Sequence, residues 1–215
     1  EEHGDIVSNK VICLQSYNML PNDDSPRVAL YKNEESWWSE DLQSGDLHER
    51  CLKDRDLISI EGARWQLRLA QLNEQTQNLA ESLIPLEKLL AEFHVSQDEE
   101  NVQLSILGSG DPIDLKFRNY HYLSLHLARQ KIADEQRGIV EAEQGWMYRE
   151  DAAKALGVEE MHLNLYIHRA RKQFSKSVKN VSNTSSFIEC RPGQLRFGAL
   201  PCRIFKAEKL ECESN

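Results

Sequence analysis

The first third of the chain alternates apolar and polar residues with a period of two. Residues 11–14, 28–31, 57–60 and 65–69 are short apolar runs or alternations, and a stretch rich in Pro, Asn and Asp at residues 21–27 separates the first from the second. Runs of this length with polar breaks are typical of β-strands that bury one face. The pattern predicts an all-β sandwich over residues 1–70.

A different spacing begins after residue 70. Intervals of four and three residues separate seven mostly apolar positions: Leu72, Thr76, Leu79, Leu83, Leu86, Leu90 and Phe93. This heptad spacing predicts a helical linker over residues 71–95, which forms a homodimer through residues 72–93 or packs on its own chain by the same stripe. Pro85 interrupts the pattern, because an interior proline removes a helix hydrogen bond and kinks or splits the element.

The second half of the chain mixes both periods. Residues 102–117 alternate around a turn that contains Gly and Pro, which predicts a hairpin. The pattern then predicts a helix, a short strand, a helix closed by a glycine, a basic helix and a second hairpin (residues 120–132, 146–147, 149–156, 163–174 and 187–197). We expect these elements to form one module over residues 100–210.

The basic helix combines one apolar stripe with polar side chains on its other faces. The stripe consists of residues spaced by four, three and four positions: Leu163, Ile167, Ala170 and Phe174. The other faces carry Asn164, Tyr166, His168, Arg169, Arg171 and Lys172. Such a helix has the form of a nucleic-acid recognition helix, and the alternative is a surface helix whose charges keep it soluble.

The charge of the chain is divided unevenly along its length. The net charge is −9, but residues 1–100 hold 9 Lys+Arg against 21 Asp+Glu, and residues 101–215 hold 17 against 14. Within residues 161–206 the count is 9 basic residues against one acidic residue. Contacts with DNA phosphates depend on such local positive charge, so the acidic total does not exclude a DNA partner.

Composition and motifs exclude several classes of protein. The five cysteines are odd in number and lack a CxxC pair, which favours reduced thiols in the cytoplasm. We expect no membrane partner and no secretory signal, since the chain lacks an apolar run of 18 residues and starts with an acidic segment. Glycine-rich nucleotide loops, HExxH and GxSxG are absent, and histidines do not stand beside acidic residues at metal spacing. The sequence predicts no enzyme, no cofactor and no metal site.

Two segments of the first module resemble the second half of a forkhead-associated (FHA) domain. Trp38-Ser-Glu-Asp-Leu-Gln-Ser-Gly is similar to the family's W-x-x-D-L-x-S, and Leu52-Lys-Asp-Arg-Asp-Leu-Ile-Ser-Ile-Glu-Gly to its L-x-x-G-D-x-I-x-I-G. Ser8-Asn-Lys-Val-Ile-Cys-Leu is similar to its S-x-x-H-a-x-l. The resemblance implies a partial FHA domain that binds a phosphoprotein, with Ser8 and Ser44 at the phosphopeptide site.

The chain departs from the FHA pattern at the positions that bind phosphate. Val11 stands where the family has His, Ser44-Gly-Asp stands where it has Asn-Gly, and no arginine-bearing strand precedes Ser8. Phosphate capture relies on charge-assisted contacts, most often from arginine. The alternative to phosphopeptide binding is therefore a small β-sandwich that makes ordinary protein contacts.

Three segments of the second module resemble the OmpR-type effector domain of bacterial transcription regulators. Met147-Tyr-Arg-Glu-Asp-Ala is similar to the start of its second helix, Leu163-Asn-Leu-Tyr-Ile-His-Arg-Ala-Arg-Lys-Gln-Phe to its recognition helix, and Ile188-Glu-Cys-Arg-Pro-Gly-Gln-Leu-Arg-Phe to its wing. The resemblance implies a winged helix-turn-helix with an N-terminal sheet. It implies a recognition helix in the major groove and a wing arginine in the minor groove of DNA.

Candidate DNA contacts follow from this resemblance and from side-chain chemistry. Asn164, His168 and Arg171 are the candidates for base reading, since Asn pairs with adenine and Arg with guanine. The candidates for phosphate contacts are Arg169, Lys172 and Lys176. The candidates on the wing are Arg191, at its tip, and Arg196, which is equally compatible with a structural role.

The expected fold class is α+β, with an N-terminal all-β FHA-like sandwich, a helical linker and a C-terminal winged helix-turn-helix. The first functional hypothesis is a cytoplasmic, sequence-specific transcriptional regulator that binds double-stranded DNA. The second is a non-catalytic adaptor that binds protein partners through its FHA-like domain, with the winged helix as a further protein-contact surface. The charge of residues 161–206 favours the first, and the opposite charges of the two halves also allow the acidic half to dock on the basic half.

Overall fold

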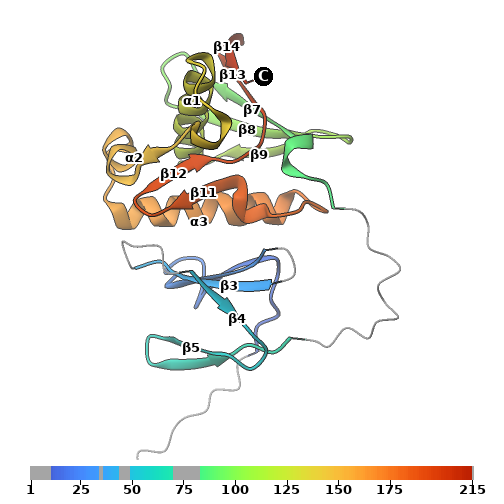
Figure 1. Ribbon diagram of the computed structural model, residues 1–215, viewed down its shortest axis with the longest axis vertical. Coiled ribbons are helices and arrows are strands. Elements are labelled where there is room, and N and C mark those ends of the chain that lie inside the picture. Colours follow the sequence, from blue (N-terminus) through green and yellow to red (C-terminus); the bar gives the residue numbers. More distant parts are fainter. Residues whose placement is uncertain (1–10, 34–35, 44–48, 70–82, 215) are drawn as a thin grey trace, which may run out of the picture.

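The computed structural model describes residues 11–33, 36–43, 49–69 and 83–214. We call residues 11–69 the N-terminal module and residues 83–214 the C-terminal module. Figure 1 shows the strands of the N-terminal module on one side of helix α3 (Glu160–Ser177) and the rest of the C-terminal module on its other side. Helix α3 therefore lies between the two modules.

The N-terminal module contains a four-stranded antiparallel sheet in the order β1-β2-β3-β4 and a separate hairpin, β5-β6. The strands are β1 (Tyr17–Leu20), β2 (Val28–Asn33), β3 (Ser36–Asp41), β4 (Glu49–Leu52), β5 (Leu57–Ile60) and β6 (Ala63–Gln66). The β5-β6 turn is tight because Glu61 and Gly62 both have positive φ, at 50° and 81°. Two-residue hairpin turns require this conformation.

Both faces of the four-stranded sheet pack against other elements, mainly at β1 and β2, whereas β4 exposes three of its four residues. One face packs on the hairpin through Leu20, Leu30, Leu52, Ile58, Ile60 and Leu67. The other face forms a cluster of Tyr17, Met19, Ala29, Tyr31 and Leu42, against which Leu165 of α3 packs. All four residues of β1 are buried. A sheet of this kind needs a covering element on each face, and α3 covers the second face.

The C-terminal module contains a five-stranded sheet in the order β14-β13-β7-β8-β9. Its strands are β7 (Leu90–Val95), β8 (Val102–Leu107), β9 (Ile113–Phe117), β13 (Cys202–Lys206) and β14 (Lys209–Glu213). Strands β7 and β13 are parallel, and the other neighbours are antiparallel. The hairpin predicted for residues 102–117 corresponds to β8 and β9.

Helices α1 and α3 of this module each contact both the large sheet and a small one. They are α1 (His121–Gln136), α2 (Arg149–Leu156) and α3, and the small sheet contains β10 (Met147–Tyr148), β12 (Gln194–Phe197) and β11 (Ile188–Arg191), in that order. Short 3-10 turns cover Leu86–Lys88, Glu141–Glu143 and Thr184–Phe187. Gly157 ends α2 at φ 64°, the left-handed cap that its sequence predicted.

A chain of aromatic side chains connects the sheets to α3. Phe93 of β7 meets Phe197 of β12 with ring centroids 5.9 Å apart, Phe197 meets Phe187 at 5.4 Å, and Phe187 stacks on Phe174 of α3 at 4.6 Å. All four residues are at most 1% exposed. The apolar stripe predicted on α3 (Leu163, Ile167, Ala170 and Phe174) is thus buried in the core of the C-terminal module.

The predicted helical linker over residues 71–95 is wrong for the part that the structure describes. Leu86 lies in a 3-10 turn, and Leu90 and Phe93 belong to strand β7. Pro85 has extended geometry and precedes the 3-10 turn, and in β7 the buried side chains alternate as Ala91, Phe93 and Val95, with period two. The seam proposed for a homodimer through residues 72–93 is therefore absent from residues 83–93, and residues 71–82 lie outside the described ranges.

The predicted fold class is also wrong as a whole. The described ranges contain fourteen β-strands and three α-helices, so the chain is mostly β, and α+β describes it only loosely. A winged helix-turn-helix unit with an open recognition helix is not evident, because α3 is covered on one side by the N-terminal sheet and on another by its own core. Strands β7 and β13 also join segments more than a hundred residues apart in sequence into one sheet, which the local pattern did not predict.

Candidate functional site

The contact between α3 and the N-terminal sheet brings together four of the eight side chains that the sequence singled out for DNA binding. We call this contact the α3 interface. It consists of Ser16, Tyr17, Asp23, Glu40 and Leu42 from the N-terminal module and Asn164, His168, Arg171, Lys172 and Ser175 from α3. The three predicted base-reading residues, Asn164, His168 and Arg171, are buried in it.

Arg171 is the centre of the α3 interface. Its Nε and one terminal nitrogen donate hydrogen bonds to the carbonyl oxygen of Ile188, at 2.9 and 2.7 Å. The other terminal nitrogen lies 3.3 Å from Oε2 of Glu40, which is 131 residues away in sequence. The side chains of Arg171 and Glu40 are only 3% and 6% exposed. The two modules are therefore joined by a buried ion pair.

His168 lies between Glu40 and Tyr17 in the same interface. The Tyr17 hydroxyl donates a hydrogen bond to Nδ1 of His168, and Nε2 of His168 lies 3.4 Å from Oε1 of Glu40. Burial raises the pKa of Tyr17 far above its usual value, so the hydroxyl stays protonated and acts as the donor. These partners assign the proton of a neutral His168 to Nε2, where it faces the carboxylate.

The charges at this contact fix the ionisation of Glu40. Burial by itself would raise its pKa, but the nearby His168 and Arg171 lower the pKa to about 2. Burial lowers the pKa of His168, against the opposing effect of Glu40. Because His168 is then neutral near pH 7, the permanent charge that keeps Glu40 ionised is that of Arg171. The interface holds a carboxylate, a guanidinium and a neutral imidazole.

Asn164 uses its amide within the interface. Its Oδ1 accepts a hydrogen bond from Arg149 of α2, and its Nδ2 donates to the carbonyl oxygen of Leu42 at 3.3 Å. Arg149 is itself only 6% exposed. The side chain that was predicted to read adenine is thus occupied by the N-terminal module and by α2.

The edge of the interface is formed by contacts that are partly exposed to solvent. Lys172 forms an ion pair with Asp23, and the hydroxyls of Ser16 and Ser175 lie 2.6 Å apart. The Asp23 side chain is 65% exposed, so solvent screens this pair. Ser16 is exposed but Ser175 is buried, which places the serine pair at the boundary between solvent and interface.

Two of the predicted phosphate-contacting residues lie outside the interface. Arg169 is half-buried, and Lys176 is exposed, on the side of α3 that the N-terminal sheet leaves open. His162 is exposed and Tyr166 half-buried on the same side, at helical spacing from Arg169. This open side is the part of α3 that remains accessible when the modules are in contact.

The two predicted wing arginines are held within the C-terminal module. The guanidinium groups of Arg191 and Arg196 lie over the ring of Trp146, at 4.2 and 4.6 Å from its centroid. Arg191 pairs with Glu143 at 3.1 Å, and Arg196 pairs with Glu189 at 2.7 Å. We call these five residues the Trp146 cluster. Arg191 lies at the tip of the β11-β12 hairpin, as the sequence predicted, and there a carboxylate and an aromatic face hold its guanidinium group.

These contacts account for much of the local positive charge. Of the nine basic residues in residues 161–206, six form ion pairs with acidic residues of the chain: Arg171, Lys172, Arg191, Arg196, Arg203 and Lys206. Two of these pairs, with Glu40 and Asp23, cross between the modules. The acidic partners were not recognised in the sequence, where the only available signal was the acidity of the first hundred residues.

The predicted phosphopeptide residues cannot be placed. Ser8 and Ser44 both lie outside the described residues. Among the described residues of the N-terminal module, Arg27 pairs with Glu61, and Arg50 pairs with Asp56. Phosphopeptide binding therefore stays a prediction from the sequence.

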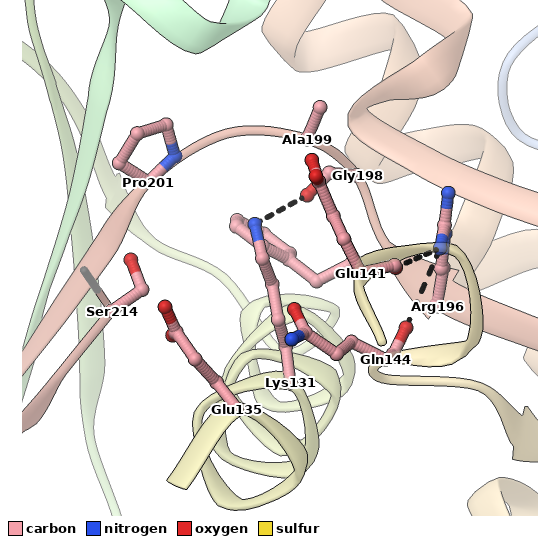
Figure 2. Close-up of a pocket in the computed structure, with 10 residues that line it drawn as sticks. Lys131, Glu135, Glu141, Gln144, Arg196, Gly198, Ala199, Pro201 and Ser214 are labelled. Atoms are coloured by element: carbon pink, nitrogen blue, oxygen red, sulfur yellow. Dashed lines mark hydrogen bonds between the residues drawn. The ribbon is translucent and has the colours of Figure 1, made fainter. Parts of the chain in front are cut away.

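A separate polar cavity lies in the C-terminal module (Figure 2). It has a volume of about 320 Å³ and is lined by residues of α1, the 141–144 turn and the 196–201 connection. Lys131 extends into it and donates hydrogen bonds to the carbonyl oxygens of Gly198 and Leu200, at 3.0 and 2.9 Å. Burial lowers the pKa of Lys131. With two of its three donors bound to backbone, Lys131 holds the connection that leads to β13.

Within the described ranges, no group of three or more His, Cys, Asp or Glu side chains is arranged to hold a metal ion. None of the helices in the described part of the chain is long and apolar enough to cross a membrane. No family model matches the sequence, and neither a curated protein nor a solved structure matches it. The chemistry of the α3 interface is therefore the basis for assigning a function.

Proposed function

We propose that this chain is a cytoplasmic, non-catalytic regulator that binds double-stranded DNA through α3. The observation that carries the proposal is the composition of this helix. Its 18 residues include four basic residues and one acidic residue, in a chain whose net charge is −9. The apolar stripe anchors the helix in the core, so the basic side chains are held on a rigid support. A rigid helix with basic groups opposite its anchor suits a duplex.

Different residues of α3 have different roles in this proposal. Arg169 and Lys176 lie on the open side, and they neutralise phosphates when DNA first approaches. Asn164, His168 and Arg171 carry the groups that read bases, and they are covered by the N-terminal module. We assign Arg191 and Arg196 to the stability of the Trp146 cluster rather than to DNA contact.

The test is a titration of the full chain with a pool of random duplexes over a range of salt concentrations. We expect the affinity to fall steeply as salt rises, because each neutralised phosphate releases condensed counterions. Arg169→Ala combined with Lys176→Ala is expected to weaken binding and to reduce the slope of log affinity against log salt by about two.

The matched control is Lys209→Ala, which removes an exposed lysine from β14, at the opposite end of the C-terminal module from α3 (Figure 1). We expect it to leave affinity and slope unchanged. If the full chain and its variants bind no duplex at low salt, DNA binding by α3 is disproved. An equal loss in the control would show that only the total charge matters.

A second function is favoured by one observation, the pairing of six of the nine basic residues in residues 161–206 with acidic groups of the same chain. This pairing suits a non-catalytic adaptor that binds a protein partner through its N-terminal module. An adaptor predicts no salt-dependent duplex binding, even after the α3 interface is opened. The salt titration with random duplexes therefore has different expected results for the two functions.

A further inference from the structure

We infer that the N-terminal module is an intramolecular cover of α3, whose carboxylates Glu40 and Asp23 occupy the positions that a base edge and a phosphate of DNA would take beside Arg171 and Lys172. The inference rests on the proposed function and assigns a mode of regulation to the same helix. In the covered form, only the open side of α3 is accessible to a duplex. Displacement of the N-terminal sheet exposes the remaining polar groups.

The first support is the chemistry of the side of α3 that is covered. Interfaces that stay closed are mostly apolar and resemble a domain core, whereas interfaces that open are more polar. Leu165 is the one residue of α3 in the apolar cluster of the N-terminal sheet. The other contacts of α3 with this module are made by Asn164, His168, Arg171, Lys172 and Ser175. Each of these side chains can also hydrogen-bond to water or to a nucleic acid.

The second support is the geometry of the Arg171–Glu40 pair. The carbonyl oxygen of Ile188 orients the guanidinium from within the C-terminal module, at 2.7 and 2.9 Å. The outward nitrogen meets Glu40 in a single contact of 3.3 Å. A guanidinium forms stronger, bidentate pairs with carboxylates, phosphates and the edge of guanine. Arg171 is thus pre-oriented by its own module and only partly satisfied by the cover.

The third support is that two neighbouring basic residues of α3 each have an acidic partner in the N-terminal module. Arg171 and Lys172 are adjacent on α3, and each pairs with a carboxylate from a different segment of the N-terminal module, Glu40 of β3 and Asp23 of the loop before β2. Two negative charges thus lie beside the basic half of the helix. A duplex presents the same sign of charge at short intervals along its backbone.

The cover and a duplex exclude each other on this side of α3. A helix is about 10–12 Å across with its side chains, and the major groove is about 12 Å wide, so a groove that admits α3 leaves no room for a packed sheet. The apparent affinity for DNA is then the intrinsic affinity reduced by the fraction of molecules that are open. Any change that opens the α3 interface must tighten DNA binding.

A reversible cross-link tests this coupling in the full chain. Ser16 and Ser175 face each other with their oxygen atoms 2.6 Å apart, so Ser16→Cys with Ser175→Cys places two thiols within reach of a disulfide. The background carries Cys13→Ser, Cys51→Ser, Cys190→Ser and Cys212→Ser, which removes the native thiols that are exposed or half-buried. We expect the oxidised protein to bind a duplex at least about tenfold more weakly than the same protein after reduction.

An opening variant tests the coupling in the other direction. Glu40→Gln with Asp23→Asn removes both carboxylates of the cover and keeps the side-chain shapes, and we expect duplex affinity to rise about tenfold. The control is Glu211→Gln, which removes one carboxylate from an ion pair with Arg129, on β14 far from α3. We expect the control to leave affinity unchanged.

Opening is measured separately from DNA binding. Ser175 is only 3% exposed, so the thiol introduced by Ser175→Cys alone reacts with an alkylating reagent when the interface opens. In the same background, Glu40→Gln with Asp23→Asn should accelerate this reaction. Faster alkylation with tighter DNA binding supports the inference.

Two outcomes would overturn it. Faster alkylation without a change in affinity would show that the cover does not compete with DNA, and the proposed function would survive. Equal duplex binding by the oxidised and reduced cross-linked protein would have the same meaning. If the opened variant also binds no duplex at low salt, the proposed function itself fails.

Discussion

Two clusters hold three of the five arginines of residues 161–206, and they differ in which parts of the chain they join. In the α3 interface, Arg171 is fully enclosed, and its carboxylate partner Glu40 comes from the other module. In the Trp146 cluster, Arg191 and Arg196 are partly exposed, and their partners Glu143 and Glu189 lie in the same module. The first cluster connects two modules and can separate with them. The second cluster stabilises one module from within.

The difference follows from burial rather than from residue type. An arginine–carboxylate pair at a surface contributes little, because water and salt screen it. A buried pair as a whole also contributes little to the free energy of unfolding, because both ions have lost their hydration. Removing one partner is costly, however, because it leaves the other charge unpaired in a poorly solvated site. The α3 interface is therefore sensitive to single substitutions, and the Trp146 cluster is tolerant of them.

The largest effect is expected for Arg171→Met. This change leaves Glu40 buried without its charge partner and should lower the free energy of unfolding by about 3–5 kcal/mol. Urea denaturation followed by tryptophan fluorescence measures the loss. The matched control is Lys172→Met, the neighbouring residue at the edge of the interface, which should lower the same free energy by about 0–1 kcal/mol. Equal losses in the two variants would contradict the central position of Arg171.

The next effect is a loss of stability in acid. The pKa of Glu40 is lowered in the folded chain to about 2, so its contribution is complete above its ordinary pKa of 4.5 and disappears as the pH falls toward 2. The Glu40 carboxylate therefore contributes stability at neutral pH that is lost in acid. The pKa of His168 is also lowered in the folded chain, so protonation of His168 below its ordinary pKa of 6.5 weakens the interface further. Both groups act in the same direction.

Alkylation of the thiol introduced by Ser175→Cys, measured from pH 7 to pH 5 with correction for the pH dependence of thiol reactivity, reports this weakening. We expect the protection of the thiol to fall as the pH falls through 6.5. His168 faces Tyr17, Glu40, Arg171 and Arg149, and His168→Gln keeps a hydrogen-bonding side chain among them while removing the ionisation. The dependence above pH 5 should disappear in this variant, and its persistence would assign the effect to another group.

The smallest effect is expected for Trp146→Leu. Two guanidinium groups lose the aromatic face beneath them, and each such contact is worth about 0.5–1 kcal/mol at a partly exposed site. The free energy of unfolding should fall by about 1–2 kcal/mol in the same urea experiment. The thiol introduced by Ser175→Cys should stay protected in this variant, but react faster with Arg171→Met. Loss of protection in both Trp146→Leu and Arg171→Met would contradict the conclusion that only the α3 interface joins the two modules.

Several elements could be predicted because their cause is local. The apolar stripe of α3 and the glycine that ends α2 depend only on residues that are close together in the sequence, and both were predicted correctly. The alternation in residues 57–60 likewise predicted strand β5. The error at residues 83–95 arose because Leu86, Leu90 and Phe93 fit a heptad by coincidence. Strand β7 is decided instead by pairing with β8 on one side and with β13 on the other.

The candidate site shows the same limit. The basic character of α3 was visible in its composition, and so was the acidity of the first hundred residues. Neither observation shows that Glu40 meets Arg171, or that Tyr17 donates its hydroxyl hydrogen to His168, because these contacts join residues 131 and 151 positions apart. The prediction that Asn164, His168 and Arg171 form an accessible face failed for this reason.

The sequence by itself determined the three helices of the C-terminal module, its hairpins β8-β9 and β11-β12, and the opposite charges of the two halves. These properties depend on neighbouring residues or on sums along the chain. The sequence did not predict the hairpin β13-β14. Only the tertiary structure decided that residues 90–95 form a central strand and that the N-terminal module covers the side of α3 that carries Asn164, His168 and Arg171. Burial and charge pairing depend on which groups lie next to each other in space, and the packing of distant segments determines those neighbours.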